Sequence, residues 1–293
     1  MNWNALADSI SKLTGTPFQI ESAAPVGGGD IHNAYRLHTA EGNFFLKSNQ
    51  SSQAALFETE ANSLKALSST LSITVPKVIA TGVENDQAWL LLEYLELSPQ
   101  GDDFQRGKDL ALLHHQINET KQFGWFEDNF IGKTRQPNGW ASDWVQFYGQ
   151  NRLLPQLKLA LSNGASPTLM DKGTRLIDKL PDFFQTYQPE ASPLHGDLWG
   201  GNSSFTQTGE AVFYDPASYY GDREADLAMT ELFGGFRPDF YQGYDSVFPL
   251  DSGYAQRKNL YNLYHVLNHF NLFGGHYANQ SERMIQTLLD SVG

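Results

Sequence analysis

Four polar residues in the last third of the sequence have the types and spacing that phosphoryl transfer requires. His195, Asp197 and Asn202 lie in the tract HGDLWGGN, and Asp215 follows the short apolar tract AVFY. This reaction needs a carboxylate near the attacking hydroxyl, oxygen ligands for a metal ion on the phosphates, and groups that hold donor and acceptor in line. We therefore expect Asp197 to be the catalytic carboxylate, and Asn202 and Asp215 to bind Mg²⁺.

The spacing of these residues matches the catalytic loop of kinases. That loop has the pattern H-x-D-x-x-x-x-N, which His195, Asp197 and Asn202 follow in type and distance. The alternative is structural: HGD is a polar turn, and the Asp-Pro pair at 215–216 ends a strand or a helix. The complete set between apolar strands favours the catalytic interpretation.

A glycine-rich tract near the start of the chain is a candidate phosphate-binding turn. Gly27, Gly28 and Gly29 stand between two expected strands, where backbone amides can cover phosphates. The tract lacks the G-x-G-x-x-G spacing, and the chain contains no Walker A sequence. Three glycines are also compatible with a plain turn.

Lys47 gives the glycine tract its significance. It lies in the apolar tract FFLKS, where a lysine is unfavourable unless it is paired. In kinases a lysine at this place contacts the α- and β-phosphates and is held by a glutamate of the next helix. We expect Glu60 to be that partner, with Glu58 as the second choice; the alternative is a lysine on an edge strand.

The end of the expected N-terminal sheet is a candidate adenine site. The apolar tract WLLLEYL ends in Glu93, Tyr94 and Leu95. A kinase strand in this position leads into the hinge, whose backbone groups bind adenine. These three residues are therefore assigned to nucleotide binding by their position alone.

The surrounding elements predict an α+β fold with two lobes, of the protein-kinase-like type. Residues 1–96 are expected to form a small β-rich lobe that binds nucleotide, with five strands and a helix inserted after the third strand. Residues 97–293 are expected to form a larger helical lobe with the catalytic loop, the metal site and the acceptor site. The expected helices lie within 102–119, 139–163, 167–187, 223–235 and 257–293.

Composition excludes several classes of function. The net charge is −13 and no run of Lys or Arg occurs, so we expect no nucleic-acid partner. No stretch approaches 18 apolar residues and the N-terminus is not a signal peptide, so we expect a cytoplasmic protein without a membrane partner. There is no Cys, which rules out disulfides and thiol catalysis.

Other polar residues are given lesser roles. Asp222 is expected to cap the helix that follows it, and Asp226 to brace the catalytic loop. His265 and His269 share one helix face, but without an intervening H-E-x-x-H glutamate we interpret them as pocket-lining or packing residues. Trp199, Asp222 and the region 265–276 are the candidates for the acceptor pocket. Trp125, Trp140 and Trp144 are expected in the core.

The chain resembles the fructosamine kinase (ketosamine kinase) family, which is close to the aminoglycoside and choline phosphotransferases. The resemblance spans nearly the whole length and is carried by the tracts PVGGGDIHNAYRL, FFLKSN, FETEANSLKAL, FGWFEDNFIGKTRQPNGWASDWVQFYGQNRLLPQL, PLHGDLWGGNSSF, YDPASYYGDREADLAMTELFGGF and NLYHVLNHFNLFGGHY. It implies ATP and Mg²⁺ as cofactors and phosphorylation of a ketosamine, such as fructoselysine or ribuloselysine, free or on protein. The product then breaks down and releases the amine.

The resemblance also implies roles for single residues. Lys47 and Glu60 correspond to the phosphate-binding lysine and its partner, Asp197 to the base, and Asn202 and Asp215 to the metal ligands. Some members of the family carry a cysteine in the glycine-rich loop. This chain has none, so it has no thiol switch or disulfide-linked dimer, and we expect a monomer or a weak homodimer.

Two other functions remain compatible with the sequence. One is a kinase of another hydroxylated compound, such as an aminoglycoside or a simple sugar. The other is a pseudokinase that binds ATP without turnover, although such proteins usually lack the lysine, the aspartate or a metal ligand. The exact acceptor, its free or protein-bound form and the oligomeric state do not follow from the sequence.

Overall fold

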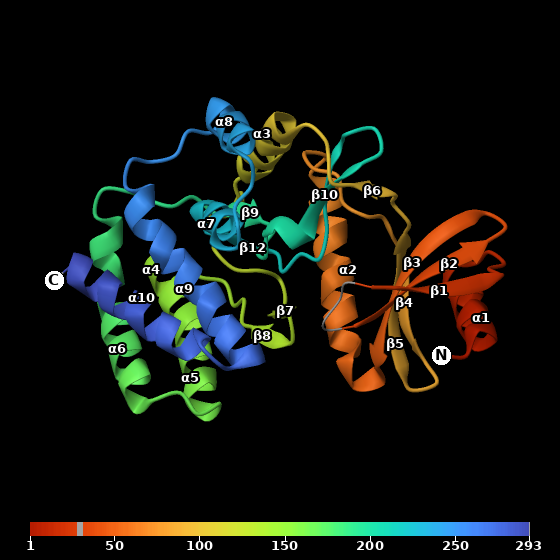
Figure 1. The fold of residues 1–293 in the computed structure, drawn as a ribbon, viewed down its shortest axis with the longest axis horizontal. Coiled ribbons are helices and arrows are strands. Elements are labelled where there is room, and N and C mark those ends of the chain that lie inside the picture. The colour runs from red at the N-terminus through yellow and green to blue at the C-terminus, as the bar shows by residue number, and fades with distance from the viewer. Residues whose placement is uncertain (28–31, 293) are drawn as a thin grey trace. The chain divides into compact units, whose positions relative to one another are not determined.

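The computed structural model describes residues 1–27 and 32–292 and divides into two compact units. We call the first the sheet unit, made of residues 1–102 and 203–216, and the second the helical unit, made of residues 103–202 and 217–292 (Figure 1). An α+β, protein-kinase-like fold was predicted, and the β-rich first part and helical second part confirm its fold class.

The sheet unit is built on a five-stranded antiparallel sheet with the order β1-β2-β3-β5-β4. Its strands are β1 (Ser22–Val26), β2 (Asn33–Thr39), β3 (Gly42–Gln50), β4 (Val78–Glu84) and β5 (Gln87–Glu93). A short 3₁₀ turn, η1 (Ser51–Gln53), leads from β3 into helix α2 (Ala54–Ser69). The predicted five strands with a helix after the third are therefore confirmed.

The alternation of side chains along β3 sends neighbouring residues to opposite faces of the sheet. Leu46 belongs to an apolar core with Leu6 and Ile10 of helix α1 (Trp3–Thr14). Lys47, the next residue, is turned to the other face, where α2 packs on β4 and β5. The strand period thus places the lysine opposite a helix that carries Glu60.

A second, small sheet adds residues 203–216 to the sheet unit. It has the order β11-β10-β6 and consists of β6 (Leu97–Ser98), β10 (Ser203–Thr206) and β11 (Ala211–Phe213). Since β10 pairs with β6, the unit reaches Asp102 and includes 203–216, which differs from the expected division after residue 96. The assignment of nucleotide binding to the first lobe and acceptor binding to the second stays a prediction.

The helical unit is organised around α9. This helix packs against α7, α10 and α5, while α3 packs against α8. The helices are α3 (Asp103–His114), α4 (Trp144–Tyr148), α5 (Leu154–Ser162), α6 (Pro167–Asp178), α7 (Glu224–Leu232), α8 (Pro238–Val247), α9 (Tyr254–Phe273) and α10 (Tyr277–Ser291). Single-turn segments are the π-helical η2 (Gly149–Leu153) and the 3₁₀ segments η3 (Leu180–Phe184) and η4 (Gly200–Asn202).

The helical unit also contains two short strand pairs, one of which flanks the predicted catalytic tract. Strands β9 (Ser192–Leu194) and β12 (Tyr219–Gly221) are antiparallel and lie on either side of it in the sequence. Strands β7 (Asn129–Ile131) and β8 (Thr134–Gln136) form a hairpin. Neither this hairpin nor α8 was predicted from the sequence.

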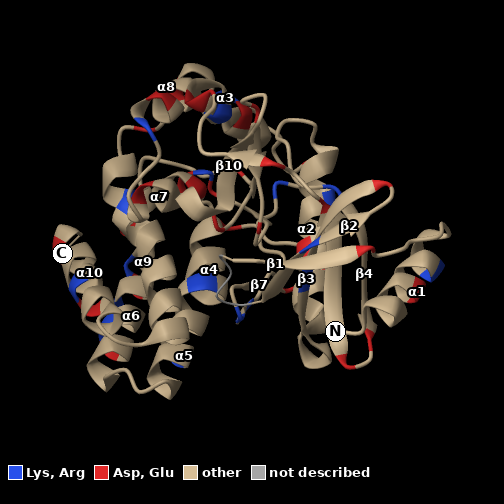
Figure 2. Ribbon diagram, turned by 45° about the vertical axis from the view of Figure 1, so that its right-hand side comes forward, with Lys and Arg blue, Asp and Glu red and all other residues tan. Residues whose placement is uncertain are grey.

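Charged residues are distributed along the ribbons of both units in Figure 2. Over residues 1–27 and 32–292, no helix has the length and apolar character needed to cross a membrane.

Candidate active site

Lys47 is the centre of a charged triad in the sheet unit. Its ammonium donates to Glu60 Oε1 at 2.7 Å and to Asp215 Oδ1 at 2.6 Å, and the side chain is nearly buried. The three residues come from β3, α2 and the turn after β11, with Asp215 in a left-handed conformation (φ 58°). The expected pairing of Lys47 with Glu60 is present, whereas Glu58 is exposed.

Electrostatics hold the triad in a charged state. Burial lowers the pKa of Lys47, but the carboxylates of Asp215 and Glu60 outweigh burial, so that its pKa lies above the ordinary value and the ammonium stays charged. Burial raises the pKa of Glu60 to about 6, against the opposing effect of Lys47 and with the support of Asp215. One buried ammonium therefore pairs with two carboxylates.

The other expected nucleotide residues lie at two ends of the large sheet. Gly27 directly follows β1 and is exposed, with open space around its α-carbon; Gly28 and Gly29 lie outside the described residues. Glu93 ends β5, and its carboxylate accepts a hydrogen bond from the Lys77 amide at 2.7 Å. Tyr94 lies under the Arg36 guanidinium, 4.7 Å from the ring centroid, and Leu95 is half-buried.

The catalytic tract in the helical unit is held by its backbone. Asp226, which is 2% exposed, accepts hydrogen bonds from the amides of His195 at 2.7 Å and of Gly196 at 2.8 Å. Gly196 has φ 85°, and a β-carbon there would lie 2.0 Å from the carbonyl oxygen of Ala217. The predicted brace by Asp226 is confirmed, and only glycine fits this turn.

Asn202 and Asp197 are joined by hydrogen bonds within the same unit. The amide nitrogen of Asn202 donates to the backbone oxygen of Asp197 at 2.8 Å and to its Oδ2 at 3.2 Å. Because the nitrogen is committed to Asp197, the Asn202 amide oxygen is the atom left to face a cation. Asp197 keeps about a quarter of its side chain exposed, as a group that meets a substrate must.

His265 on α9 is a neighbour of Asp197 that the sequence analysis did not assign to catalysis. Its Nδ1 lies 4.0 Å from Asp197 Oδ1 and has no hydrogen-bond partner, although the side chain is only 5% exposed. Burial, with a contribution from His269, lowers the pKa of His265 to about 3. The imidazole is therefore neutral, and its contact with Asp197 is not an ion pair.

Asp222 is structural. It is fully buried and accepts hydrogen bonds from the hydroxyls of Tyr187 and Tyr261 and from the backbone amide of Glu224 at 3.0 Å. The bond to Glu224 is the expected helix-start contact. A phosphate-accepting substrate cannot reach this buried carboxylate, so Asp222 does not fit its expected place in the acceptor pocket.

The hairpin β7–β8 supports the segment before β12, whose residue Ala217 lies against Gly196. Gln136 donates to the backbone oxygen of Ala217 at 3.1 Å, and Asn129 donates to that of Ser218 at 2.8 Å. Both side chains are buried. No spacing rule in the tract NFIGKTRQ reveals these contacts, because they join elements about 80 residues apart.

The three tryptophans expected in the core divide into two groups. Trp125 and Trp144 are buried, while Trp140 is 44% exposed and was wrongly placed there.

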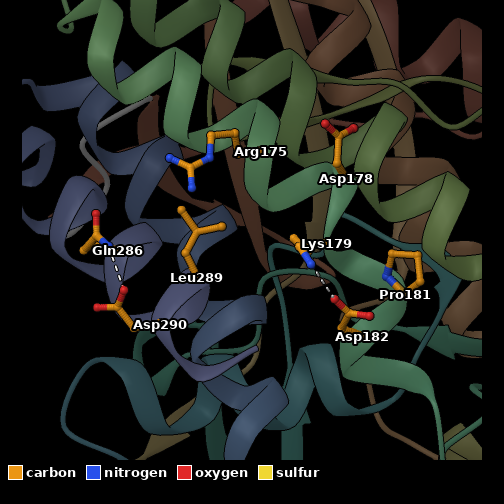
Figure 3. Close-up of a pocket in the computed structure, with 8 residues that line it drawn as sticks. All are labelled: Arg175, Asp178, Lys179, Pro181, Asp182, Gln286, Leu289 and Asp290. Atoms are coloured by element: carbon orange, nitrogen blue, oxygen red, sulfur yellow. Dashed lines mark hydrogen bonds and ion pairs between the residues drawn. The ribbon is translucent and has the colours of Figure 1, made fainter. Parts of the chain in front are cut away.

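A hollow of about 720 Å³ lies between α6, η3 and α10, away from these motifs (Figure 3). Arg175, Lys179 and the acidic Asp178, Asp182 and Asp290 line it, and Lys179 is paired with Asp182 at 3.5 Å. None of the candidate site residues contributes to its wall. The geometry of the predicted catalytic loop, rather than the size of a cavity, therefore identifies the candidate site.

Known proteins resemble this chain over nearly its whole length. The sequence pattern of the family described as fructosamine kinase matches residues 2–291. A "probable ketoamine kinase" of Synechocystis is 45% identical over 98% of this chain and 97% of its own. A chloroplastic protein-ribulosamine 3-kinase of Arabidopsis thaliana is 39% identical over 94% of this chain and 85% of its own.

Solved structures give the same result for the fold. A Haemophilus somnus protein assigned as a fructosamine-3-kinase superposes with a TM-score of 0.88 at 29% identity, over 98% of this chain and 97% of its own. An aminoglycoside phosphotransferase, solved with ADP and hygromycin B, superposes with a TM-score of 0.63 at 14% identity over 98% of both chains. The second likeness establishes the protein-kinase-like fold alone.

Proposed function

Since the chain belongs to the fructosamine kinase family, we propose that it is an ATP-dependent kinase that phosphorylates a sugar hydroxyl of ketosamines. The observation that supports a kinase is the Lys47 triad, in which Lys47 donates hydrogen bonds to Glu60 and Asp215. The acceptor half is supported by relatives named as ketoamine and protein-ribulosamine kinases. Breakdown of the phosphorylated product would release the sugar from the amine.

The sheet unit is assigned to the nucleotide. Lys47, held by Glu60, would contact the α- and β-phosphates, while the tract Gly27–Gly29 would cover phosphates with backbone amides. The backbone at Glu93, Tyr94 and Leu95 would bind adenine. The buried lysine is oriented before the nucleotide arrives, because its partners fix both its position and its charge.

The helical unit is assigned to the chemistry on the acceptor. Asp197 would accept the proton of the attacking hydroxyl as the oxygen–phosphorus bond forms and ADP leaves. The backbone of its loop is fixed by Asp226, and its side chain accepts a hydrogen bond from Asn202, so the carboxylate is positioned on both sides. The neighbouring His265 is neutral and does not form an ion pair with it.

The donor set fits Mg²⁺, which prefers carboxylate and amide oxygens and keeps phosphate and water in its shell. The Asn202 amide nitrogen donates to Asp197, so its amide oxygen can face the ion, and Asp215, which accepts from Lys47 through Oδ1, contributes a carboxylate. When bound, the ion would neutralise charge on the transferred phosphate. We assign Asn202 and Asp215 as its protein ligands.

We further propose a cytoplasmic location and a monomer or weak homodimer. The absence of Cys excludes a disulfide-linked dimer. Small ketosamines and glycated lysine in proteins are both included as acceptors.

The test is ATP consumption by the purified protein with Mg²⁺, with fructoselysine, ribuloselysine, kanamycin, choline and free ribulose as acceptors. We expect turnover of the two ketosamines and a new phosphate ester in the ³¹P spectrum. Turnover of kanamycin alone would replace the acceptor class. Binding of ATP without turnover of any ketosamine would contradict the proposal.

A further inference from the structure

A row of partly exposed aromatic side chains begins two residues after Asp197. It consists of Trp199, Phe233, His269, Phe273 and Tyr277, and we call it the aromatic row. Trp199 is 39%, Phe233 37% and Phe273 57% exposed. All five belong to the helical unit.

The rings of the aromatic row are in contact with one another. Ring centroids are 6.3 Å apart for Trp199 and Phe233, and 4.7 Å for Phe233 and His269. His269 then lies 5.6 Å from Phe273 and 5.3 Å from Tyr277. These are distances of edge-to-face and tilted aromatic pairs, so the row is one packed surface rather than isolated side chains.

The row is continuous with the catalytic carboxylate. His265, one turn before His269 on α9, approaches Asp197 with an Nδ1 that is buried and has no partner. An unpaired buried nitrogen is unfavourable unless a ligand bonds to it. A water molecule or a polar ligand atom between Asp197 and the start of the row would satisfy this nitrogen.

His269 adds a specific polar group to this surface. Its Nδ1 lies 2.8 Å from the backbone oxygen of His265, and because that oxygen only accepts, Nδ1 must carry the hydrogen. In the neutral ring Nε2 is then a hydrogen-bond acceptor. Ring faces and an acceptor nitrogen together suit a cation that carries N–H groups.

We propose that the aromatic row binds the amine-bearing half of the acceptor, a protonated secondary amine with its alkyl chain. This inference rests on the proposed function and names the part of the ketosamine that the row recognises. The sugar would lie at Asp197 and His265, and the ammonium and alkyl chain would lie along the rings. A neutral compound of the same shape should bind less well.

The test uses two acceptors that differ only at one atom: 1-deoxy-1-(butylamino)fructose and its ether analogue, 1-O-butylfructose. We expect the native protein to prefer the amine by roughly 3- to 10-fold in kcat/KM, the range expected for a cation on exposed to partly desolvated rings. Phe233→Leu keeps apolar bulk but removes a ring face, and His269→Phe removes the acceptor nitrogen. Each should reduce the preference for the amine by raising its KM more than that of the ether.

Phe126→Leu is the matched control, because Phe126 is a 60% exposed aromatic residue of the same unit outside the row. It should leave the preference intact. Equal turnover of amine and ether by the native protein, or an unchanged preference in both row variants, would overturn the inference alone. Failure of the native protein to phosphorylate any ketosamine would instead overturn the proposed function on which the inference rests.

Discussion

The two units hold their key residues by different physical means. In the sheet unit, Lys47 is fixed by opposite charges, with two carboxylates on one buried ammonium. In the helical unit, Asp197 is fixed by hydrogen bonds from Asn202 and by the backbone bonds of its loop to Asp226, and His265 beside its carboxylate is neutral. The first arrangement holds a charged ammonium that can bind phosphate, and the second orients a carboxylate.

This difference implies that the units respond to different changes. Loss of charge should disturb the sheet unit, where an unpaired buried carboxylate would remain. Loss of a hydrogen-bond acceptor should disturb the helical unit, where the loop would lose its position.

Asp197→Asn should give the largest change in activity. Asparagine keeps the size and an oxygen for Asn202 but cannot accept the proton, so kcat should fall by roughly 10²- to 10⁴-fold. The thermal midpoint should stay close to that of the native protein, because the side chain is partly exposed and accepts its hydrogen bonds from Asn202. Steady-state kinetics and thermal unfolding check both; near-native turnover would remove Asp197 from its role.

Asp226→Asn should give an intermediate effect on both stability and activity. The amide presents hydrogens where the carboxylate receives the amides of His195 and Gly196, so a loss of about 2 kcal/mol in unfolding free energy is expected. Turnover should fall by roughly 10-fold as the loop shifts. Asp239→Asn, the same change at an exposed position of α8, is the control. If both variants behave alike, the brace is not needed.

The pH dependence of stability should have opposite signs in the two units. Glu60 has a folded pKa of about 6 against an ordinary 4.5, so the folded state favours its protonated form. The protonated carboxyl contributes fully to the free energy of unfolding below pH 4.5. As the pH rises to about 6, this contribution is lost, and the free energy of unfolding falls by about 2 kcal/mol. Urea unfolding of Glu60→Gln and of the native protein between pH 4.5 and pH 6 should show this decrease in the native protein but not in the variant.

His265 should show the reverse slope. Its folded pKa is about 3 and its ordinary pKa is 6.5, so the unfolded chain takes up a proton first as the pH falls. The contribution of the neutral ring is complete above pH 6.5 and decreases by about 2 kcal/mol at pH 5. Between pH 7.5 and pH 5, the free energy of unfolding of His265→Gln should therefore fall by about 2 kcal/mol less than that of the native protein. An equal decrease in both proteins would contradict the burial of a neutral ring.

Features that depend on a local residue pattern could be predicted from the sequence. The five strands, the helix after the third strand and the Lys47–Glu60 pair all followed from alternation and from the unfavourable burial of a lone lysine. The brace of the catalytic loop by Asp226, which was expected from the sequence, is also present.

Features that depend on distant partners could not be predicted. Gln136 reaches Ala217 through a hairpin that has no strong turn signal, and His265 meets Asp197 only because α9 packs along the helical unit. The extension of the sheet unit to 203–216 depends on pairing of β10 with a two-residue strand, too short to recognise in a sequence.

The most direct test of the division of labour is calorimetric titration of Mg·ATP into two variants, Lys47→Met and Asp197→Asn. Lys65→Met, which changes an exposed lysine of α2, controls for the loss of charge alone. We predict that Lys47→Met binds at least 10-fold more weakly than the native protein, while Asp197→Asn and Lys65→Met bind as the native protein does. Native affinity in Lys47→Met, or a loss confined to Asp197→Asn, would contradict the assignment of nucleotide binding to the sheet unit and of acceptor chemistry to the helical unit.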